Sequence, residues 1–338
     1  MPRSMLACLA LLLCPLIGVA ADVCPTLRQQ QFSGDSATRI AAVACNEHQL
    51  WYRPFIDTNG RIASGKVWEG ESSRLDDGGT EAWRRVAMYW RESGLLWQMA
   101  GFAGATDCGN AAAGGGYMTA SCRAFVIDNP WSAAFISYVL TKANLPGFRA
   151  SASHFDYVRD AYQRPAENAY QFLDPATARP ETGDLLCNVR IPSRAYGYQG
   201  LIAAIDSGAN GLNMHCDIVT ATNPGNDGTV YLVGGNVHQG VTMRMLPVNR
   251  SGALWALPQR VGPEPFCSPD TVASCNFNRL DWSVLLKLKS PAALAQLPRA
   301  AQSPVGMMSP PVPSTNCCVN CLVGANPPVP RCAARPNR

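Results

Sequence analysis

The stretch Asp128-Asn129-Pro130-Trp131-Ser132-Ala133-Ala134-Phe135-Ile136-Ser137 predicts the start of a buried helix. Asparagine is a good N-cap and proline suits the first helical position, so we expect the helix to begin at Pro130. Apolar residues then recur at helical spacing, at Trp131, Ala134, Phe135, Tyr138 and Val139. The helix is expected to end near residues 144–147, which read Asn-Leu-Pro-Gly.

Ser132 falls in the first turn of this predicted helix. Backbone N–H groups there have no intrahelical acceptor, so they can stabilise an oxyanion beside a nucleophilic hydroxyl. Serine is also common near helix starts because its side chain makes local hydrogen bonds. The position of Ser132 is therefore compatible with a catalytic role and with a purely local one.

A second feature is a predicted β-hairpin. Residues 214–221 alternate in polarity, 223–228 read Asn-Pro-Gly-Asn-Asp-Gly, and 229–233 are β-branched and aromatic. A symmetric turn places His215 opposite or diagonal to Asn236, where an amide can orient an imidazole. Histidine on a strand is also an ordinary partly buried residue, so this placement alone does not identify a catalytic base.

Alternation along the first strand of the hairpin separates the neighbours of His215. Asp217 shares a face with His215, while Cys216 points to the other face. Asp217 is therefore a second candidate to orient the imidazole. Cys216 is a poor candidate nucleophile for this histidine.

Taken together, these features resemble a known arrangement. The order is the helix at Ser132, then Gly183-Asp184-Leu185-Leu186 entering a strand, then His215, then Val233-Gly234-Gly235-Asn236-Val237. This order is similar to that of CHAP-type and NlpC-type cell-wall hydrolases. It resembles still more closely the bacterial family called domain of unknown function 2272. The resemblance covers roughly residues 81–257.

The resemblance implies an α+β, papain-like fold in which a helix carrying the nucleophile packs on an antiparallel sheet. It implies that Ser132 replaces the nucleophilic cysteine, His215 is the general base, and Asn236 or Asp217 orients the ring. A serine hydroxyl does not ionise near neutral pH as a thiol can, so it needs base assistance during attack.

Three further residues are predicted to contact substrate, namely Trp131, His154 and His238. His154 can line the cleft of a papain-like layout or cap the helix predicted over residues 155–162. His238 lies two residues beyond Asn236 and shares its strand face, although a position in a surface loop is favoured for it.

The function implied by the resemblance is hydrolysis of amide bonds, with peptidoglycan peptides as the substrate. Loss of the thiol leaves open a non-catalytic envelope module that binds cell-wall fragments or a partner protein. A serine esterase or acyltransferase is a third possibility. We expect no cofactor and no metal, because the four histidines lack HExxH or a comparable pattern.

The compartment is predicted from the first segment. Residues 1–21 combine a basic start, an apolar run and small residues at the end, which is typical of a secretory signal peptide. Leu13 before Cys14 is a poor match to a lipoprotein signal. No later run is long enough to span a bilayer, so we expect a periplasmic or secreted protein without an integral membrane segment.

The composition of the 338 residues supports this prediction. The net charge of +4 is weak and scattered, which argues against a nucleic-acid partner. Signal cleavage removes Cys8 and Cys14 and leaves twelve of the 14 cysteines, an even number suited to disulfides. Several cysteines fall in sequence-local pairs, namely Cys24 with Cys45, Cys108 with Cys122, and Cys267 with Cys275, while the connectivity is left open by a single sequence. For the cluster Cys317, Cys318, Cys321 and Cys332, disulfides are favoured over a zinc site.

The predicted organisation has five parts. They are the signal peptide 1–21, an N-terminal extension 22–80, a hydrolase-type domain 81–260, an extension of that domain 261–290, and a Pro/Cys-rich tail 291–338. Within the domain, residues 81–96 show the spacing of an amphipathic helix, and residues 106–117 read as a flexible Gly/Ala loop.

Overall fold

The computed structural model describes residues 22–298 except 64, 111–115 and 266. The predicted signal peptide and the C-terminal cysteine cluster lie outside the described residues. Four disulfides are present in the described part of the chain. None of the helices described is long and apolar enough to cross a membrane.

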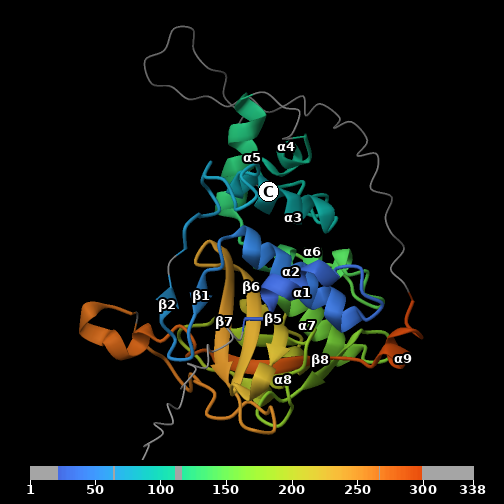
Figure 1. Ribbon diagram of the computed structural model, residues 1–338, viewed down its shortest axis with the longest axis vertical. Coiled ribbons are helices and arrows are strands. Elements are labelled where there is room, and N and C mark those ends of the chain that lie inside the picture. The colour runs from blue at the N-terminus through green and yellow to red at the C-terminus, as the bar shows by residue number, and fades with distance from the viewer. Residues whose placement is uncertain (1–21, 64, 111–115, 266, 299–338) are drawn as a thin grey trace, which may run out of the picture.

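One eight-stranded sheet forms the centre of the fold (Figure 1). Its strands are β1 (Phe55–Ile56), β2 (Ile62–Ala63), β3 (Tyr170–Leu173), β4 (Leu185–Val189), β5 (Met214–Thr222), β6 (Thr229–Val237), β7 (Gly240–Pro247) and β8 (Asp281–Leu288). They are ordered β2-β1-β7-β6-β5-β4-β8-β3. All neighbours are antiparallel except β1 and β7, which run parallel. The predicted α+β class is confirmed.

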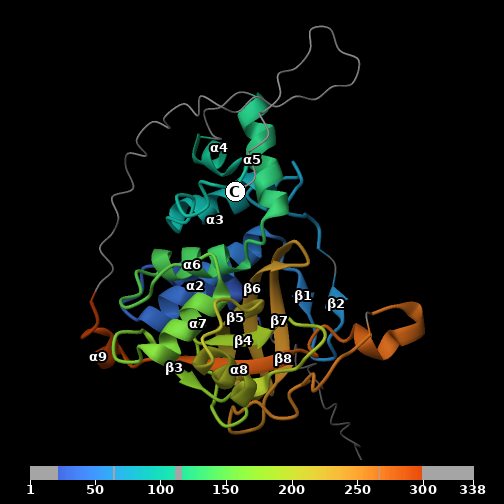
Figure 2. The same cartoon turned by 180° about the vertical axis from the view of Figure 1, so that it is seen from behind.

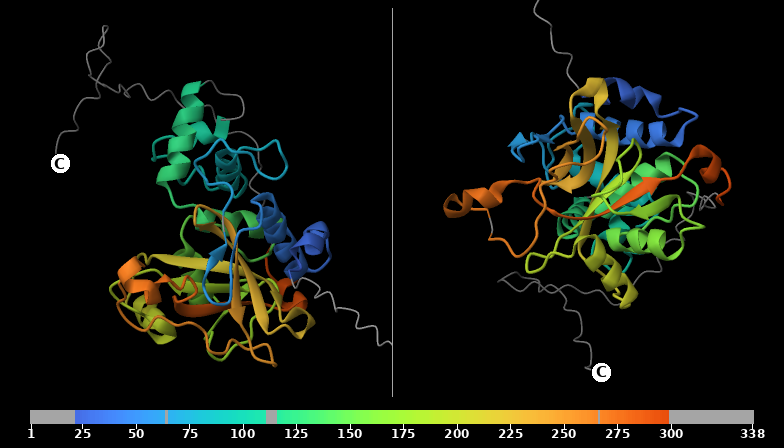
Figure 3. Two further views of the ribbon diagram at one scale, coloured as in Figure 1. Left: turned by 60° about the vertical axis from the view of Figure 1, so that its left-hand side comes forward. Right: turned by 90° about the horizontal axis from the view of Figure 1, so that it is seen from below.

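Helices cover one face of the sheet and extend beyond it. They are α1 (Cys24–Leu27), α2 (Ser36–Leu50), α3 (Ala82–Glu92), α4 (Ala105–Asn110), α5 (Gly116–Asp128), α6 (Ser132–Lys142), α7 (His154–Gln163), α8 (Gly197–Asp206) and α9 (Pro291–Leu294). Helices α2 and α6 pack on β5 and β6. Helices α3, α4 and α5 form a cap beyond α6, on the side away from the sheet (Figures 2 and 3).

The sheet has two apolar faces because side chains alternate along each strand. Cys216 and Ile218 of β5 belong to the large core beneath the helices. Val219 of β5 and Leu232 of β6 belong to a smaller cluster on the opposite face. The central strands are therefore buried on both sides, which holds them rigidly beside the start of α6.

A buried carboxylate ties the helices together. Glu47 on α2 accepts a hydrogen bond from Arg85 Nε of α3 at 2.8 Å and from the Tyr89 hydroxyl at 2.7 Å. It also accepts from the Tyr138 hydroxyl of α6 at 3.3 Å. Because Glu47 is only 1% exposed, this charged network is desolvated and its geometry positions α6 relative to α2.

The N-terminal segment and the last strand are integral to this sheet. Strand β1 pairs with β7, and β8 lies in the interior between β4 and β3. Residues 22–80 and 261–290, which the sequence analysis treats as extensions, therefore contribute to the same core. Long-range strand pairing of this kind leaves little local signal in a sequence.

The local predictions agree with the structure in outline, and three of them differ in detail. The predicted hairpin is β5 and β6, with a bulge between Val219 and Ala221. The helix expected from Pro130 begins instead at Ser132, because the Asn129 amide donates to the Phe125 carbonyl at 2.8 Å and closes α5. Part of the loop expected at 106–117 is helical, in α4 and the start of α5.

The structure contains the three sequence-local disulfides and one more. All three sequence-local pairs named above are bonded: Cys24–Cys45, Cys108–Cys122 and Cys267–Cys275. A fourth, Cys187–Cys216, joins directly opposed residues of β4 and β5. It lies in the core beneath the helices, on the strand that carries His215.

Candidate functional site

The side chain of Ser132 lies in the first turn of α6, as the sequence predicts. The first backbone N–H groups of a helix have no intrahelical acceptor, so those of Ser132 and Ala133 are available beside the hydroxyl. The chain entering this turn is held by Asn236, whose amide oxygen accepts from the Trp131 N–H at 3.1 Å. The amide nitrogen of Asn236 donates to Glu69 Oε2 at 3.0 Å. The turn is thus fixed from β6.

A histidine contacts the Ser132 hydroxyl directly. His154 Nε2 lies 2.7 Å from Ser132 Oγ, and His154 Nδ1 contacts the Tyr157 hydroxyl one helical turn further along α7. With its proton on Nδ1, His154 donates to the Tyr157 oxygen and can accept the Ser132 proton at Nε2. This is the geometry that a general base needs toward a serine nucleophile.

Burial sets the protonation state of this pair. Burial lowers the pKa of His154 well below the usual histidine value; the neighbouring His215 adds to this effect, Asp217 opposes it, and Arg190 adds to it. Burial also raises the pKa of Tyr157 well above that of an ordinary phenol. At neutral pH His154 is therefore an uncharged acceptor and Tyr157 is a neutral phenol.

A second histidine, His215, packs against His154. The rings of His215 and His154 have centroids 5.2 Å apart. His215 Nε2 is 2.7 Å from Asp217 Oδ1, and Asp217 Oδ2 accepts from Arg244 Nε at 2.8 Å. His215 Nδ1 is buried and has no hydrogen-bond partner among the described residues. Although burial acts to raise it, His215 and Arg244 hold the pKa of Asp217 well below its usual value.

The contacts differ from the predicted triad in the histidine that meets the serine. Both Ser132 and His215 lie in the described part of the chain, and no hydrogen bond joins them; the histidine in contact with Ser132 is His154. Cys216 faces the core beneath the helices, so alternation along β5 turns His215 away from it. Of the two residues predicted to orient the His215 ring, Asp217 contacts it, whereas Asn236 bonds to Trp131 and Glu69.

Two residues expected to contact substrate lie elsewhere. Trp131 is fully buried, stacks on Trp51 and donates from Nε1 to Glu69, so it is part of the core. His238 is exposed in the turn between β6 and β7 and packs edge-on against Phe277. Neither Trp131 nor His238 lines the cleft described below, and their contact with substrate stays a prediction.

Residues 77–288 match the family described as an uncharacterized protein conserved in bacteria (DUF2272). The chain belongs to the DUF2272 family. The matched region runs from the cap helices to β8 and includes Ser132, His154, His215 and Asp217. No curated protein and no solved structure matches the chain.

In this DUF2272 chain the serine and histidine face a cleft of about 610 Å³. Ser132 and His154 are only 6% and 5% exposed, so the cleft is their route to solvent. Apolar side chains form much of its wall, from Trp90, Met99, Phe102, Leu212 and Met214. Arg190, which directly follows β4, lines the same cleft. A cleft with an apolar wall next to a few polar groups is typical of ligand sites.

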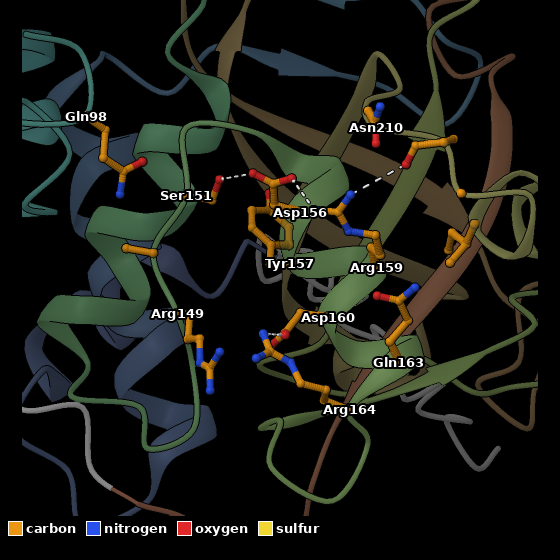
Figure 4. A pocket seen from close by; sticks show the side chains of 14 residues that line it. Gln98, Arg149, Ser151, Asp156, Tyr157, Arg159, Asp160, Gln163, Arg164 and Asn210 are labelled. Carbon is orange, nitrogen blue, oxygen red and sulfur yellow. Dashed lines mark hydrogen bonds and ion pairs between the residues drawn. The ribbon is translucent and has the colours of Figure 1, made fainter.

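A second cavity of about 550 Å³ is lined by residues 149–151 and by side chains of α7 (Figure 4). Tyr157 lines this cavity with its ring, while its hydroxyl reaches His154. Asp156 accepts from Ser151 Oγ at 2.7 Å and from Arg159 at 3.1 Å (Figure 4). These contacts fix the first turn of α7 and hence the position of His154.

Three residues of the DUF2272 site were not predicted from the sequence. Tyr157 follows His154 by three residues, and this helical spacing was a usable signal for a contact. Arg190 directly follows the strand that begins after Gly183-Asp184, where polar residues often serve sites. Arg244 is on β7 and reaches Asp217 across the sheet, so no local pattern reveals it.

Close packing requires the two glycines of the sequence Val233-Gly234-Gly235-Asn236. A Cβ on Gly234 would overlap Asp217 Oδ1 and lie 3.1 Å from His215 Nε2. A Cβ on Gly235 would overlap Phe135 of α6. These glycines therefore let β6 approach the buried ion pair on one side and α6 on the other.

We expect Gly234→Ala to destabilise the protein by at least about 2 kcal/mol, because the added methyl overpacks the His215–Asp217 contact. Chemical denaturation measures this loss. Gly240→Ala is the matched control, since its Cβ meets nothing closer than Trp51 at 3.4 Å, and should cost less than about 1 kcal/mol. Equal midpoints for the two variants would contradict the steric role of Gly234.

Proposed function

We propose that this protein is an exported serine hydrolase that cleaves amide bonds, with Ser132 as nucleophile and His154 as general base. The observation that carries the proposal is the 2.7 Å contact of Ser132 Oγ with His154 Nε2 at the wall of a cleft. The position of Ser132 at the start of α6 adds backbone N–H donors for the oxyanion.

The proposed reaction has two halves. Ser132 Oγ attacks the substrate carbonyl while His154 Nε2 takes its proton, and the N–H groups of the first turn stabilise the oxyanion. His154 then gives the proton to the leaving nitrogen, which departs and leaves an acyl-serine. Water hydrolyses this ester with His154 again as base, which returns Ser132 to its starting state.

The His215, Asp217 and Arg244 group is proposed to position His154. The ring of His215 packs 5.2 Å from that of His154, and Asp217 raises the pKa of His154 by its charge. This favours the imidazolium that forms during attack. Because the three side chains are at most 5% exposed, the arrangement is held rigidly.

The fold and substrate follow from the resemblance to CHAP-type and NlpC-type hydrolases. We propose that the core is papain-like, which is supported by the packing of α6 on the strands β5 and β6. Peptides of bacterial peptidoglycan are the proposed substrates.

One observation favours ester substrates as a second candidate. His154 Nδ1 contacts the neutral hydroxyl of Tyr157 and not a carboxylate, so it is a weaker base than the histidine of a Ser-His-Asp triad. A weak base suits activated leaving groups better than amines. We therefore expect faster turnover of a p-nitrophenyl ester than of the corresponding anilide.

Labelling with a fluorophosphonate probe tests the proposal. The probe should modify Ser132 in the wild-type protein, as mass spectrometry of tryptic peptides will show, and Ser132→Ala should remain unlabelled. Ser137 in the same helix is the control, because its hydroxyl is bonded to the Ser151 carbonyl. Muropeptide binding without turnover, in a protein that no probe labels, would instead indicate a binding module.

The pH dependence of the reaction follows from the lowered pKa of His154. A base works when unprotonated, so kcat/KM should fall only as pH drops through a value below about 6.5, the ordinary histidine pKa. Activity should then be flat through neutral pH. Rates on an uncharged ester between pH 4 and 8 measure this, and an acid limb centred above pH 7 would contradict the assignment.

A further inference from the structure

The described side chains that line the cleft at Ser132 include a positive charge and no negative one. Of the described residues that line it, Arg190 is the one with a fixed charge, and none is aspartate or glutamate. The remaining lining is apolar or neutral, with Asn129, Asn213 and Ser153 as further polar side chains. A cleft of this composition disfavours cationic ligands and favours ligands with one negative charge.

Arg190 is also without a partner of its own. In the described part of the chain, no side-chain hydrogen bond or ion pair to its guanidinium occurs, although its backbone N–H donates to the Asn213 carbonyl at 2.7 Å. That bond holds the residue at the wall of the cleft. Arg190 and the proposed base His154 line the same cleft, and the charge of Arg190 lowers the pKa of that ring.

The arginines of the second cavity differ from Arg190 because they are in ion pairs. The cavity's three arginines are each paired with an acid. Arg159 pairs with Asp156 and Arg164 with Asp160 (Figure 4), and Arg149 pairs with Glu167. Charges that are already neutralised gain little from a ligand anion. The unpaired arginine is thus in the cavity that holds Ser132.

We propose that Arg190 binds a carboxylate of the substrate, so that the site selects acyl peptides with a free carboxylate near the scissile bond. The inference rests on the proposed function and names its substrate class. A guanidinium binds a carboxylate through two parallel N–H donors, which also orients the bound peptide. The apolar wall formed by Trp90, Phe102 and Leu212 is then available to an uncharged side chain of the same peptide.

Binding of a matched pair of peptides tests the inference without catalysis. The probes are N-acetyl-leucyl-alanine and its C-terminal amide, titrated calorimetrically into the full-length Ser132→Ala protein so that neither is consumed. We expect the acid to bind at least about tenfold more tightly than the amide, as for a charge-assisted hydrogen-bonded pair. Adding Arg190→Met should remove this preference, and Arg190→Lys should retain part of it.

Arg250→Met is the matched control, because Arg250 is an exposed arginine that does not line the cleft. It should leave the preference for the acid unchanged. Equal binding of the two peptides, no measurable binding of the acid, or a preference that survives Arg190→Met would overturn the inference. Labelling of wild-type Ser132 by the fluorophosphonate probe reports separately on the proposed function, so the two failures are distinguishable.

Discussion

We expect His154→Ala to lower kcat/KM on a p-nitrophenyl ester by about 10³-fold, within the range for loss of a general base. The reason is geometric, since His154 Nε2 is the imidazole nitrogen hydrogen-bonded to Ser132 Oγ. His215→Ala keeps this contact and removes only the ring behind it, so we expect a loss of about tenfold. Steady-state kinetics of both variants provide the measurement.

The control for this comparison is His238→Ala, because His238 is exposed and lies outside the residues that line the cleft. Its kcat/KM should stay within about twofold of wild type. Thermal melts of all three variants separate lost chemistry from lost folding. A larger loss in His215→Ala than in His154→Ala, at equal stability, would make His215 the base and contradict the present assignment.

Asp217→Ala destabilises the protein by about 3–5 kcal/mol, the range for removing one partner of a buried ion pair. Arg244 is 5% exposed and would keep its charge without the carboxylate that neutralises it. Its remaining acceptors, the Phe277 carbonyl and Asn278 Oδ1, are neutral. The free energy of unfolding in urea measures the effect.

Glu167→Ala is the matched control for Asp217→Ala, because it breaks an ion pair with Arg149 in which both side chains are 61% exposed. This loss should stay below about 1 kcal/mol. Adding Arg244→Met to Asp217→Ala should recover part of the stability, since the unpaired charge is removed. A double variant less stable than Asp217→Ala would contradict this explanation.

The contribution of Asp217 also depends on pH. Its pKa is lowered on folding, so its stabilising effect is fully present above the unfolded value of about 3.9 and is lost as pH falls through the folded value. The difference in stability between wild type and Asp217→Ala should therefore shrink below about pH 4.

The elements near the site were predictable where the signal is local. The hairpin of β5 and β6 follows from alternation on either side of a turn-rich segment, and α6 follows from apolar spacing. The start of α6 is predicted two residues too early, because Asn129 closes the end of α5 and does not cap α6. A capping preference alone does not tell which of two adjacent helices an asparagine will cap. Three disulfides close short loops, and the sequence analysis named them as pairs of near neighbours.

The partners within the site were harder to predict. The sequence analysis identified Ser132 and His215 as candidates for the same site and noted that His154 could line it. Which histidine touches the serine depends on where α7 docks against α6 and on which side of β5 each residue faces. That docking involves contacts such as Ser137 with Ser151, whose residues lie on different segments.

By itself, the sequence determined the hairpin and the place of Ser132 in the first turn of a helix, and it indicated three near-neighbour pairs of cysteines. Each of these depends on residues close together in the chain, where spacing and turn chemistry act. The α+β class was implied by the resemblance to a family. The tertiary structure decided that His154 contacts Ser132, that Asp217 and Arg244 hold His215, and that Arg190 lines the cleft. These contacts join elements far apart in the chain, and their geometry is set by packing in a shared core.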